Sequence, residues 1–125
     1  MTVVATDTRR VLIVDDAEDL RILLRFGLER SEHLQVVGEA EDGLDAVEQA
    51  RALQPDLVFL DVAMPRMDGL QALPLIREAV PHVRVVVLSG FNEGTMAENA
   101  RRAGADHYVV KGKSLSELVA LLRTV

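Results

Sequence analysis

The chain has 125 residues, a length that suits one domain with a single hydrophobic core. Its net charge of -6 argues against nucleic acid or an anionic membrane surface as a direct partner, because both need a basic surface. The absence of cysteine excludes disulfides, thiolate metal sites and a cysteine nucleophile. No apolar run approaches the roughly 18 residues of a membrane span, and no signal-peptide core follows Met1, so we expect a cytoplasmic protein.

Five short apolar runs predict buried strands, because each is bounded by turn residues or by a helical pattern. They cover residues 11–14, 34–40, 57–60, 84–88 and 107–110. The second run is the most polar, which suits an edge strand. Residues 1–8 are expected to form a flexible leader, followed by one domain over residues 9–125.

Amphipathic patterns predict five helices that alternate with these strands. They cover about residues 17–30, 43–53, 69–79, 93–103 and 114–125. The first helix is expected to bury Leu20, Leu23, Leu24 and Gly27. Pro74 falls within the third helix, so either Pro74 lies in its first turn or the helix kinks there. The fourth helix has mostly small apolar side chains and is expected to be held weakly enough to move, with Gly104 as its C-terminal cap.

Strands that alternate with helices predict an α/β fold: a parallel sheet with right-handed crossovers and helices on both faces. The carboxyl ends of all its strands lie along one edge, where such sheets bind ligands. The groups that close four of the strands are Asp15, Asp16, Asp61, Ser89 and Lys111. Each has an ordinary interpretation alone: a helix cap for Asp16, a cap or turn for Asp61, a turn for Ser89 and a surface cation for Lys111. Their joint placement indicates one polar site.

Three crowded carboxylates repel one another and raise each other's pKa values unless a cation joins them. A set of oxygen ligands without histidine or cysteine suits Mg²⁺, and Mn²⁺ is also possible. An aspartate in such a site can be a nucleophile that accepts a phosphoryl group. Lys111 would then neutralise charge on that group, and the Ser89 hydroxyl would donate to one of its oxygens.

Several segments resemble the receiver (response-regulator) domain of two-component signalling, over about residues 9–125. They are residues 11–16, 61–65, 67–69, 87–90, 103–106 and 108–111. The resemblance implies a flavodoxin-like fold with strand order 2-1-3-4-5. It also implies that Asp61 is the phosphoacceptor and that Asp15, Asp16 and Asp61 hold Mg²⁺ together with the backbone carbonyl of Ala63. Ser89 and Tyr108 resemble the switch pair of the family, and Lys111 resembles its phosphate-binding lysine.

The resemblance further implies a function as a signalling phosphoacceptor rather than an enzyme. Such a domain accepts a phosphoryl group from a sensor histidine kinase or phosphotransfer protein and assists only its own phosphorylation and dephosphorylation. The fourth helix, last strand and last helix would then change their shared face to control a partner, an output domain or a homodimer. Two alternatives remain open: a non-phosphorylated docking module, and a Mg²⁺-dependent phosphatase. Asp61 is followed by Val-Ala-Met-Pro, unlike the Asp-x-Asp-x-Thr of such phosphatases.

The sequence departs from many receivers after Lys111, where Gly112 stands in place of a proline. Without proline a cis bond costs about 2.5–4 kcal/mol, so we expect a trans Lys111–Gly112 peptide. This departure, with the Gly-Lys-Ser-Leu-Ser-Glu-Leu segment, resembles receivers that precede a helix-turn-helix domain in transcriptional regulators. We therefore expect either a stand-alone receiver or a piece of a longer regulator, and we favour the latter.

Overall fold

A computed structural model describes residues 8–90, 94–111, 117, 120 and 121. Most of the predicted leader, most of the predicted last helix and the Lys111–Gly112 peptide lie outside these residues, so the expectations about them stay predictions.

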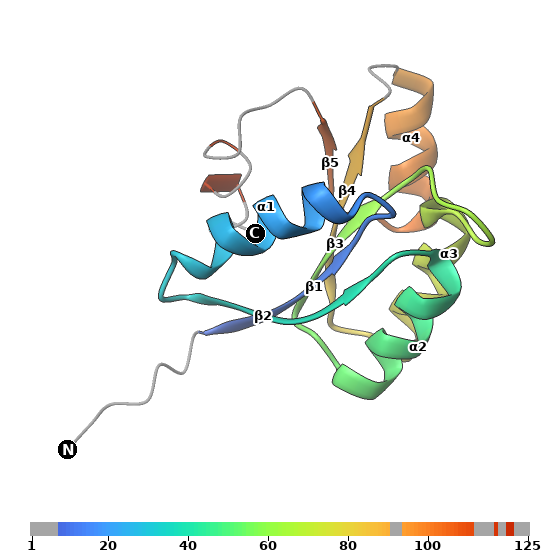
Figure 1. Cartoon of the computed structure of the whole chain (residues 1–125). Coiled ribbons are helices and arrows are strands. Elements are labelled where there is room, and N and C mark those ends of the chain that lie inside the picture. The colour runs from blue at the N-terminus through green and yellow to red at the C-terminus, as the bar shows by residue number, and fades with distance from the viewer. Residues whose placement is uncertain (1–7, 91–93, 112–116, 118–119, 122–125) are drawn as a thin grey trace.

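Strands and helices alternate along the described part of the chain (Figure 1). The strands are β1 (Arg9–Val14), β2 (Leu34–Ala40), β3 (Leu57–Asp61), β4 (Arg84–Ser89) and β5 (His107–Val110). The helices are α1 (Glu18–Glu29), α2 (Gly43–Leu53), α3 (Gly69–Ala79) and α4 (Gly94–Ala103). The strands form one parallel sheet in the order β2-β1-β3-β4-β5, which confirms the predicted topology and the edge position of the polar second strand.

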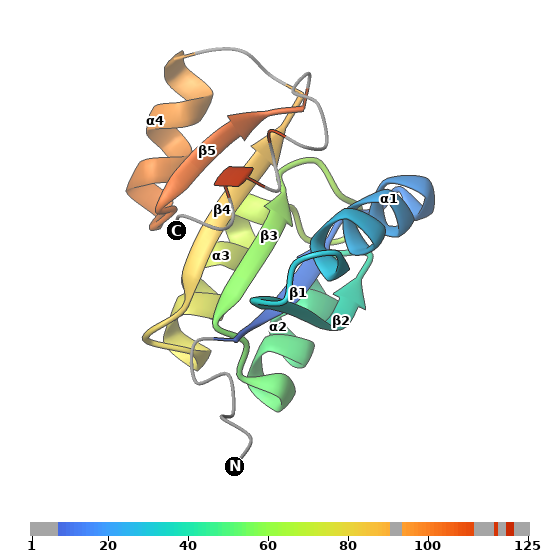
Figure 2. The ribbon, with the colours of Figure 1, turned by 90° about the vertical axis from the view of Figure 1, so that its left-hand side faces the viewer.

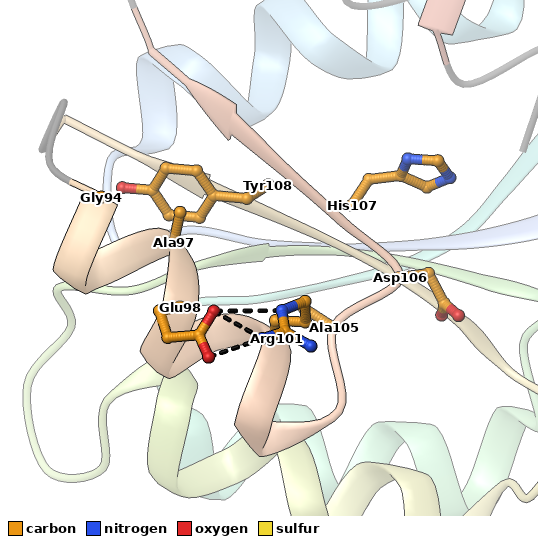
Figure 3. Close-up of a pocket in the computed structure, with 8 residues that line it drawn as sticks. All are labelled: Gly94, Ala97, Glu98, Arg101, Ala105, Asp106, His107 and Tyr108. Atoms are coloured by element: carbon orange, nitrogen blue, oxygen red, sulfur yellow. Dashed lines mark hydrogen bonds and ion pairs between the residues drawn. The ribbon is translucent and has the colours of Figure 1, made fainter.

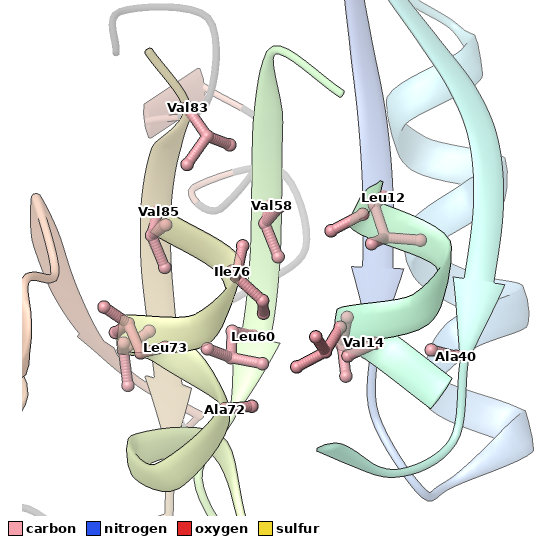
Figure 4. Close-up of a cluster of buried hydrophobic side chains, with 14 of the residues drawn as sticks. Leu12, Val14, Ala40, Val58, Leu60, Ala72, Leu73, Ile76, Val83 and Val85 are labelled. Carbon is pink, nitrogen blue, oxygen red and sulfur yellow. The ribbon is translucent and has the colours of Figure 1, made fainter. Parts of the chain in front are cut away.

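Helices cover both faces of the sheet, with α1 on one side and α2 and α3 on the other (Figure 2). Alternate residues along each strand point to opposite faces, so the sheet supplies two hydrophobic cores. The core under α2, α3 and α4 includes Leu12, Val14, Val58, Leu60, Leu73 and Ile76 (Figure 4). The core under α1 includes Val11, Ile13, Leu24, Leu28, Phe59 and Leu88. Because both faces of β3 are buried, its carboxyl-terminal residue, Asp61, is held at the edge of the cores.

One expectation for α1 is wrong, and one alternative interpretation is excluded. Leu23 is 54% exposed, whereas Leu24, Gly27 and Leu28 are buried, because Leu23 lies at the margin of the stripe that faces the sheet. Asp16 does not cap the helix: Ala17 occupies the N-cap position and makes no side-chain capping bond. Asp16 is therefore left exposed beside Asp15, with its carboxylate available for another role.

Pro74 lies in the second turn of α3, so the first of the two alternatives, a place in the first turn, is wrong, and the kink stays untested. The helix begins at Gly69, after Asp68 and Gln71 form a capping box. Pro74 is exposed, on the side of α3 where water can satisfy the carbonyl that a proline leaves without a donor.

The fourth helix buries little, as expected from its small side chains. Ala100 is its one fully buried residue, while Met96 and Ala103 pack partly against the core. Gly104 follows with φ of +112°, a left-handed conformation that confirms it as the C-terminal cap. Movement of α4 stays a prediction. Of the helices in the described segments, none is long and apolar enough to cross a lipid bilayer.

Candidate functional site

The strand ends meet as the sequence predicts. Asp15 follows β1, Asp61 ends β3, Ser89 ends β4 and Lys111 follows β5. One ligand oxygen from each of Asp15, Asp16 and Asp61 lies within 4.8 Å of the others. The Lys111 ammonium lies 3.1 Å from Asp61 Oδ1 and 3.3 Å from Asp15 Oδ2. Three carboxylates and one amine thus share one pocket at the carboxyl edge of the sheet.

The acids have buried oxygens that suit a cation. Asp15 and Asp61 are only 1% and 2% exposed. Their Oδ2 atoms accept no hydrogen bond from any described residue. A buried carboxylate oxygen without a donor is costly, and a hard divalent cation is the group that would satisfy several such oxygens together. These residues therefore fit a Mg²⁺ ion.

The acids of this site repel one another, and Lys111 offsets only part of that repulsion. Burial and the nearby Asp15 carboxylate raise the pKa of Asp61 from 3.8 to about 6, although Lys111 opposes the change. Burial alone would lower the pKa of Lys111, but its contacts with Asp61 and Asp15 outweigh burial and raise it. Lys111 thus stays charged and Asp61 is mostly ionised at neutral pH, the form that a nucleophile needs.

The loop between β3 and α3 is fixed close to Asp61 by two glycines. A Cβ atom at Gly69 would lie 2.0 Å from the carbonyl oxygen of Asp61, and the Gly69 N–H donates to Val62 O at 2.8 Å. A Cβ atom at Gly43 would lie 2.3 Å from the carbonyl oxygen of Met67, which accepts a hydrogen bond from the Gly43 N–H at 2.8 Å. The loop therefore fits closely against both helix starts, and only glycine allows this approach.

A charged pair also anchors this loop. Arg66 Nε donates to Asp42 Oδ2 at 2.8 Å, and Arg66 NH2 forms a second short contact with the same oxygen. Asp42 is 5% exposed and also caps α2, where it accepts a hydrogen bond from the Asp45 N–H at 2.8 Å. That bond and Arg66 lower the pKa of Asp42. The pair therefore joins the loop that carries Ala63 to the start of α2.

The remaining predicted residues lie around this pocket. Ser89 is 1% exposed, and its carbonyl accepts a hydrogen bond from the Lys111 N–H at 2.7 Å, which places the lysine backbone beside β4. Ala63 lies exposed in the loop two residues after Asp61, and its role as a carbonyl ligand stays a prediction. Tyr108 pairs with Val87 across β4 and β5.

Tyr108 faces α4 rather than the acids. Its ring lies beside Gly94 and Ala97 (Figure 3). These residues line a cavity of about 240 Å³ between α4 and β5, together with Glu98, Arg101, Ala105, Asp106 and His107. The side chains in Figure 3 show that α4 and β5 share a surface hollow next to the tyrosine. The switch role of Ser89 and Tyr108 stays a prediction.

Sequence reasoning missed the residues that support the acids. Arg21 donates to the carbonyl of Asp15, and Arg66 holds Asp42. Each pair joins residues from different elements, so no local pattern reveals it. The one available signal was that Arg21 follows Asp15, and Arg66 follows Asp61, within a few residues.

Comparison with known proteins gives a consistent result. Residues 11–123 match the model of the response regulator receiver domain. The chain is 37% identical to the chemotaxis protein CheY of Thermotoga maritima over 117 residues, which cover 94% of this chain and 97% of that protein. It is 36% identical to the response regulator protein VraR of Staphylococcus saprophyticus over 91% of this chain and 54% of that protein.

A solved structure agrees with these matches. The signal receiver domain of the response regulator NarL from Mycobacterium tuberculosis superimposes with a TM-score of 0.88 at 32% identity, covering 94% of this chain and 95% of that one. The chain spans about half the length of the VraR proteins it matches, and nearly all of the CheY protein.

Proposed function

This chain belongs to the response regulator receiver domain family, and from that premise we propose that Asp61 accepts a phosphoryl group from a sensor histidine kinase or a phosphotransfer protein. The observation that carries the proposal is the contact of Asp61 with Lys111 and its proximity to two further acids, one of them buried. A docking module has no use for this costly arrangement. Because histidine kinases take the phosphoryl group from ATP, we place the reaction in the cytoplasm.

The proposed transfer uses the side chains of the pocket. The Asp61 carboxylate attacks the phosphorus of a phosphohistidine, forming a P–O bond as the P–N bond breaks. The electron pair of the broken bond goes to the donor imidazole, and Asp61 becomes an acyl phosphate. Lys111, 3.1 Å from Asp61 Oδ1, is close enough to pair with an oxygen of the transferred group. Ser89 would donate its hydroxyl to another oxygen.

Asp15, Asp16, Asp61 and the carbonyl of Ala63 are the groups that would hold Mg²⁺ (or Mn²⁺) in this pocket. When bound, the ion supplies positive charge that neutralises the oxygens of the phosphoryl group. The buried Oδ2 atoms of Asp15 and Asp61 support this assignment, because neither accepts a hydrogen bond from the described residues and only that of Asp15 has an ion-pair contact, with Lys111 at 3.3 Å. The same residues would assist the later hydrolysis of the acyl phosphate, in which water attacks the phosphorus, the bond between phosphorus and the Asp61 oxygen breaks, and inorganic phosphate leaves.

The added charge, about -2 with three acceptor oxygens, would draw Ser89 and Lys111 toward the phosphoryl group. We propose that Tyr108 and α4 then change the face they share, which controls a partner, an output domain or a second copy of the chain. The small buried area of α4 supports this choice, because a weakly packed helix can move at low cost.

A phosphotransfer assay tests the proposal. The wild-type chain is incubated with a radiolabelled phosphodonor with and without Mg²⁺, beside Asp61→Asn and Asp68→Asn. Asp68 is a matched control, since it is an acid in the same loop whose role is to cap α3. We expect Mg²⁺-dependent labelling of wild type and Asp68→Asn, and none of Asp61→Asn. Continued labelling of Asp61→Asn at the wild-type level would refute the assignment. Repeated release of phosphate from small esters would instead indicate a phosphatase.

A further inference from the structure

Arg21 of α1 reaches back to the turn that carries two of the three acids. Its NH1 group donates to the carbonyl oxygen of Asp15 at 2.7 Å. Its Nε donates to Glu39 Oε1 of β2 at 3.1 Å. The Arg21 side chain is 13% exposed and the Glu39 side chain is 28% exposed, so the guanidinium is largely shielded from water. One guanidinium therefore ties the Asp15 backbone to the edge strand.

Two further hydrogen bonds fix Asp15, one through its carboxylate and one through its backbone. Its Oδ1 accepts a hydrogen bond from the Ala17 N–H at 2.8 Å, and its N–H donates to Ala40 O at 3.0 Å. With the backbone held on both sides, the remaining oxygen, Oδ2, is left directed toward Lys111 at 3.3 Å. The turn thus holds an acid close to Asp61 against the repulsion of like charges.

We propose that Arg21 is a positioning residue for the cation site, which sets the affinity of the acids for Mg²⁺ by holding the Asp15–Asp16 turn rigid. This inference rests on the proposed function, because it concerns the same pocket. Arg21 does not touch the acidic oxygens that would bind the ion, and it acts through the Asp15 carbonyl. Loss of such support typically weakens metal binding by about 10- to 100-fold.

Arg25 provides a matched control within the same helix. It lies one turn further along α1 and pairs with the other oxygen of the same glutamate, with Nε 2.6 Å from Glu39 Oε2. It also pairs with Glu29 at 3.6 Å, but within the part of the chain that the structure describes none of its contacts involves the turn of Asp15. Both Arg→Met substitutions remove one positive charge, and loss of positive charge by itself favours Mg²⁺ binding. Only Arg21→Met, which also removes the contact with the Asp15 carbonyl, should weaken Mg²⁺ binding.

The experiment compares wild type, Arg21→Met, Arg21→Lys and Arg25→Met in two measurements. Calorimetric titration with MgCl₂ gives the affinity for the ion. Hydrogen exchange of the Ala17 amide in metal-free protein reports whether the Asp15 carboxylate stays in place. We expect Arg21→Met to bind Mg²⁺ about tenfold more weakly and to exchange Ala17 faster. Arg25→Met should bind Mg²⁺ at least as tightly as wild type and exchange Ala17 at the wild-type rate, and Arg21→Lys, which keeps one donor, should fall between wild type and Arg21→Met.

Equal Mg²⁺ affinity in Arg21→Met and Arg25→Met would overturn the inference. If Arg21→Met does not fold, Arg21→Lys replaces it, and affinity equal to that of Arg25→Met again overturns the inference. A wild-type chain that binds no Mg²⁺ would instead be a failure of the proposed function. In that case, Ala17 exchange decides whether Arg21 positions the turn: faster exchange in the Arg21 variants alone supports it, and unchanged exchange refutes it.

Discussion

Lys111 Nζ lies 3.1 Å from Asp61 Oδ1, joining the end of β5 to the end of β3 across β4. The same nitrogen lies 3.3 Å from Asp15 Oδ2, so one cation contacts two buried carboxylates. In the metal-free protein this amine is the main source of positive charge in the described part of the pocket. Removing the Lys111 ammonium should therefore lower both the stability of the protein and the rate of phosphoryl transfer.

Lys111→Met is expected to destabilise the metal-free protein by about 2 kcal/mol, less than the full cost of breaking a buried ion pair because Lys111 is 32% exposed. Urea denaturation in the presence of a chelator measures the change. Arg51→Met, at an exposed cation of α2, should change the free energy of unfolding by less than about 0.5 kcal/mol. Equal stability of Lys111→Met and wild type would show that the contacts contribute nothing.

Asp61→Asn is expected to be more stable than wild type in metal-free buffer above about pH 6. The folded-state pKa of Asp61 is raised from 3.8 to about 6, so the folded chain binds this proton more tightly than the unfolded chain. Ionisation of Asp61 therefore lowers stability as pH rises from about 4 to 6, by about 3 kcal/mol in all. Urea denaturation across this range should show the two proteins equal near pH 4 and separated at neutral pH. A variant less stable than wild type at neutral pH would contradict the raised pKa.

Arg77→Met is expected to cost about 2 kcal/mol, because Arg77 NH2 donates to Gly104 O at 2.6 Å and to Asp106 Oδ2 at 2.8 Å. Arg84 contacts the same aspartate at 3.5 Å but is 64% exposed, so Arg84→Met should cost less than about 0.5 kcal/mol. Thermal or urea denaturation separates the two variants. Similar losses in both would mean that Asp106 responds to charge alone.

The pH dependence of the Arg77 effect has a defined sign. Burial raises the pKa of Asp106, but the Val85 N–H and Arg77 outweigh burial and lower it below 3.8. Such a carboxylate stabilises the fold above its unfolded-state pKa and loses this contribution as pH falls through the folded-state value. The deficit of Arg77→Met relative to wild type should therefore shrink below about pH 3.8. A deficit that stays constant to lower pH would rule out the charged contact as its cause.

Gly69→Ala is expected to displace the β3–α3 loop, since the new Cβ would lie 2.0 Å from the Asp61 carbonyl oxygen. We expect a loss of at least about 2 kcal/mol in stability and weaker Mg²⁺ binding. Gly94→Ala is the control: it is also the first residue of a helix, but its Cβ would meet nothing within 4 Å. Urea denaturation and Mg²⁺ titration of both variants test this, and wild-type behaviour of Gly69→Ala would contradict the close approach.

The order of the strands and the convergence of the acids could be predicted because apolar runs and their closing residues are local patterns. Once the runs 57–60 and 84–88 are identified as parallel strands, the edge shared by Asp61 and Ser89 follows from topology alone. The position of Lys111 follows in the same way. The distance between the Lys111 ammonium and each acid cannot be predicted from topology, because it depends on side-chain packing.

The contacts of Arg21 and Arg66 could not be predicted, because each joins a charged residue to a partner fixed only by tertiary structure. Leu23 was assigned to the buried face because an apolar residue at helical spacing is ambiguous at the margin of a stripe. For Asp16 a helix cap is the ordinary alternative to a site role, because aspartate favours that position, but Ala17 occupies the N-cap of α1.

The most direct test of the central claim is to locate the phosphoryl group on the chain. The protein is incubated with acetyl phosphate and Mg²⁺, reduced with borohydride, which converts an aspartyl phosphate to homoserine, and analysed by peptide mass spectrometry. Conversion of Asp61 alone, abolished by a chelator, is the predicted result. Conversion of another acid, or no conversion of Asp61 in folded, Mg²⁺-bound protein, would contradict it.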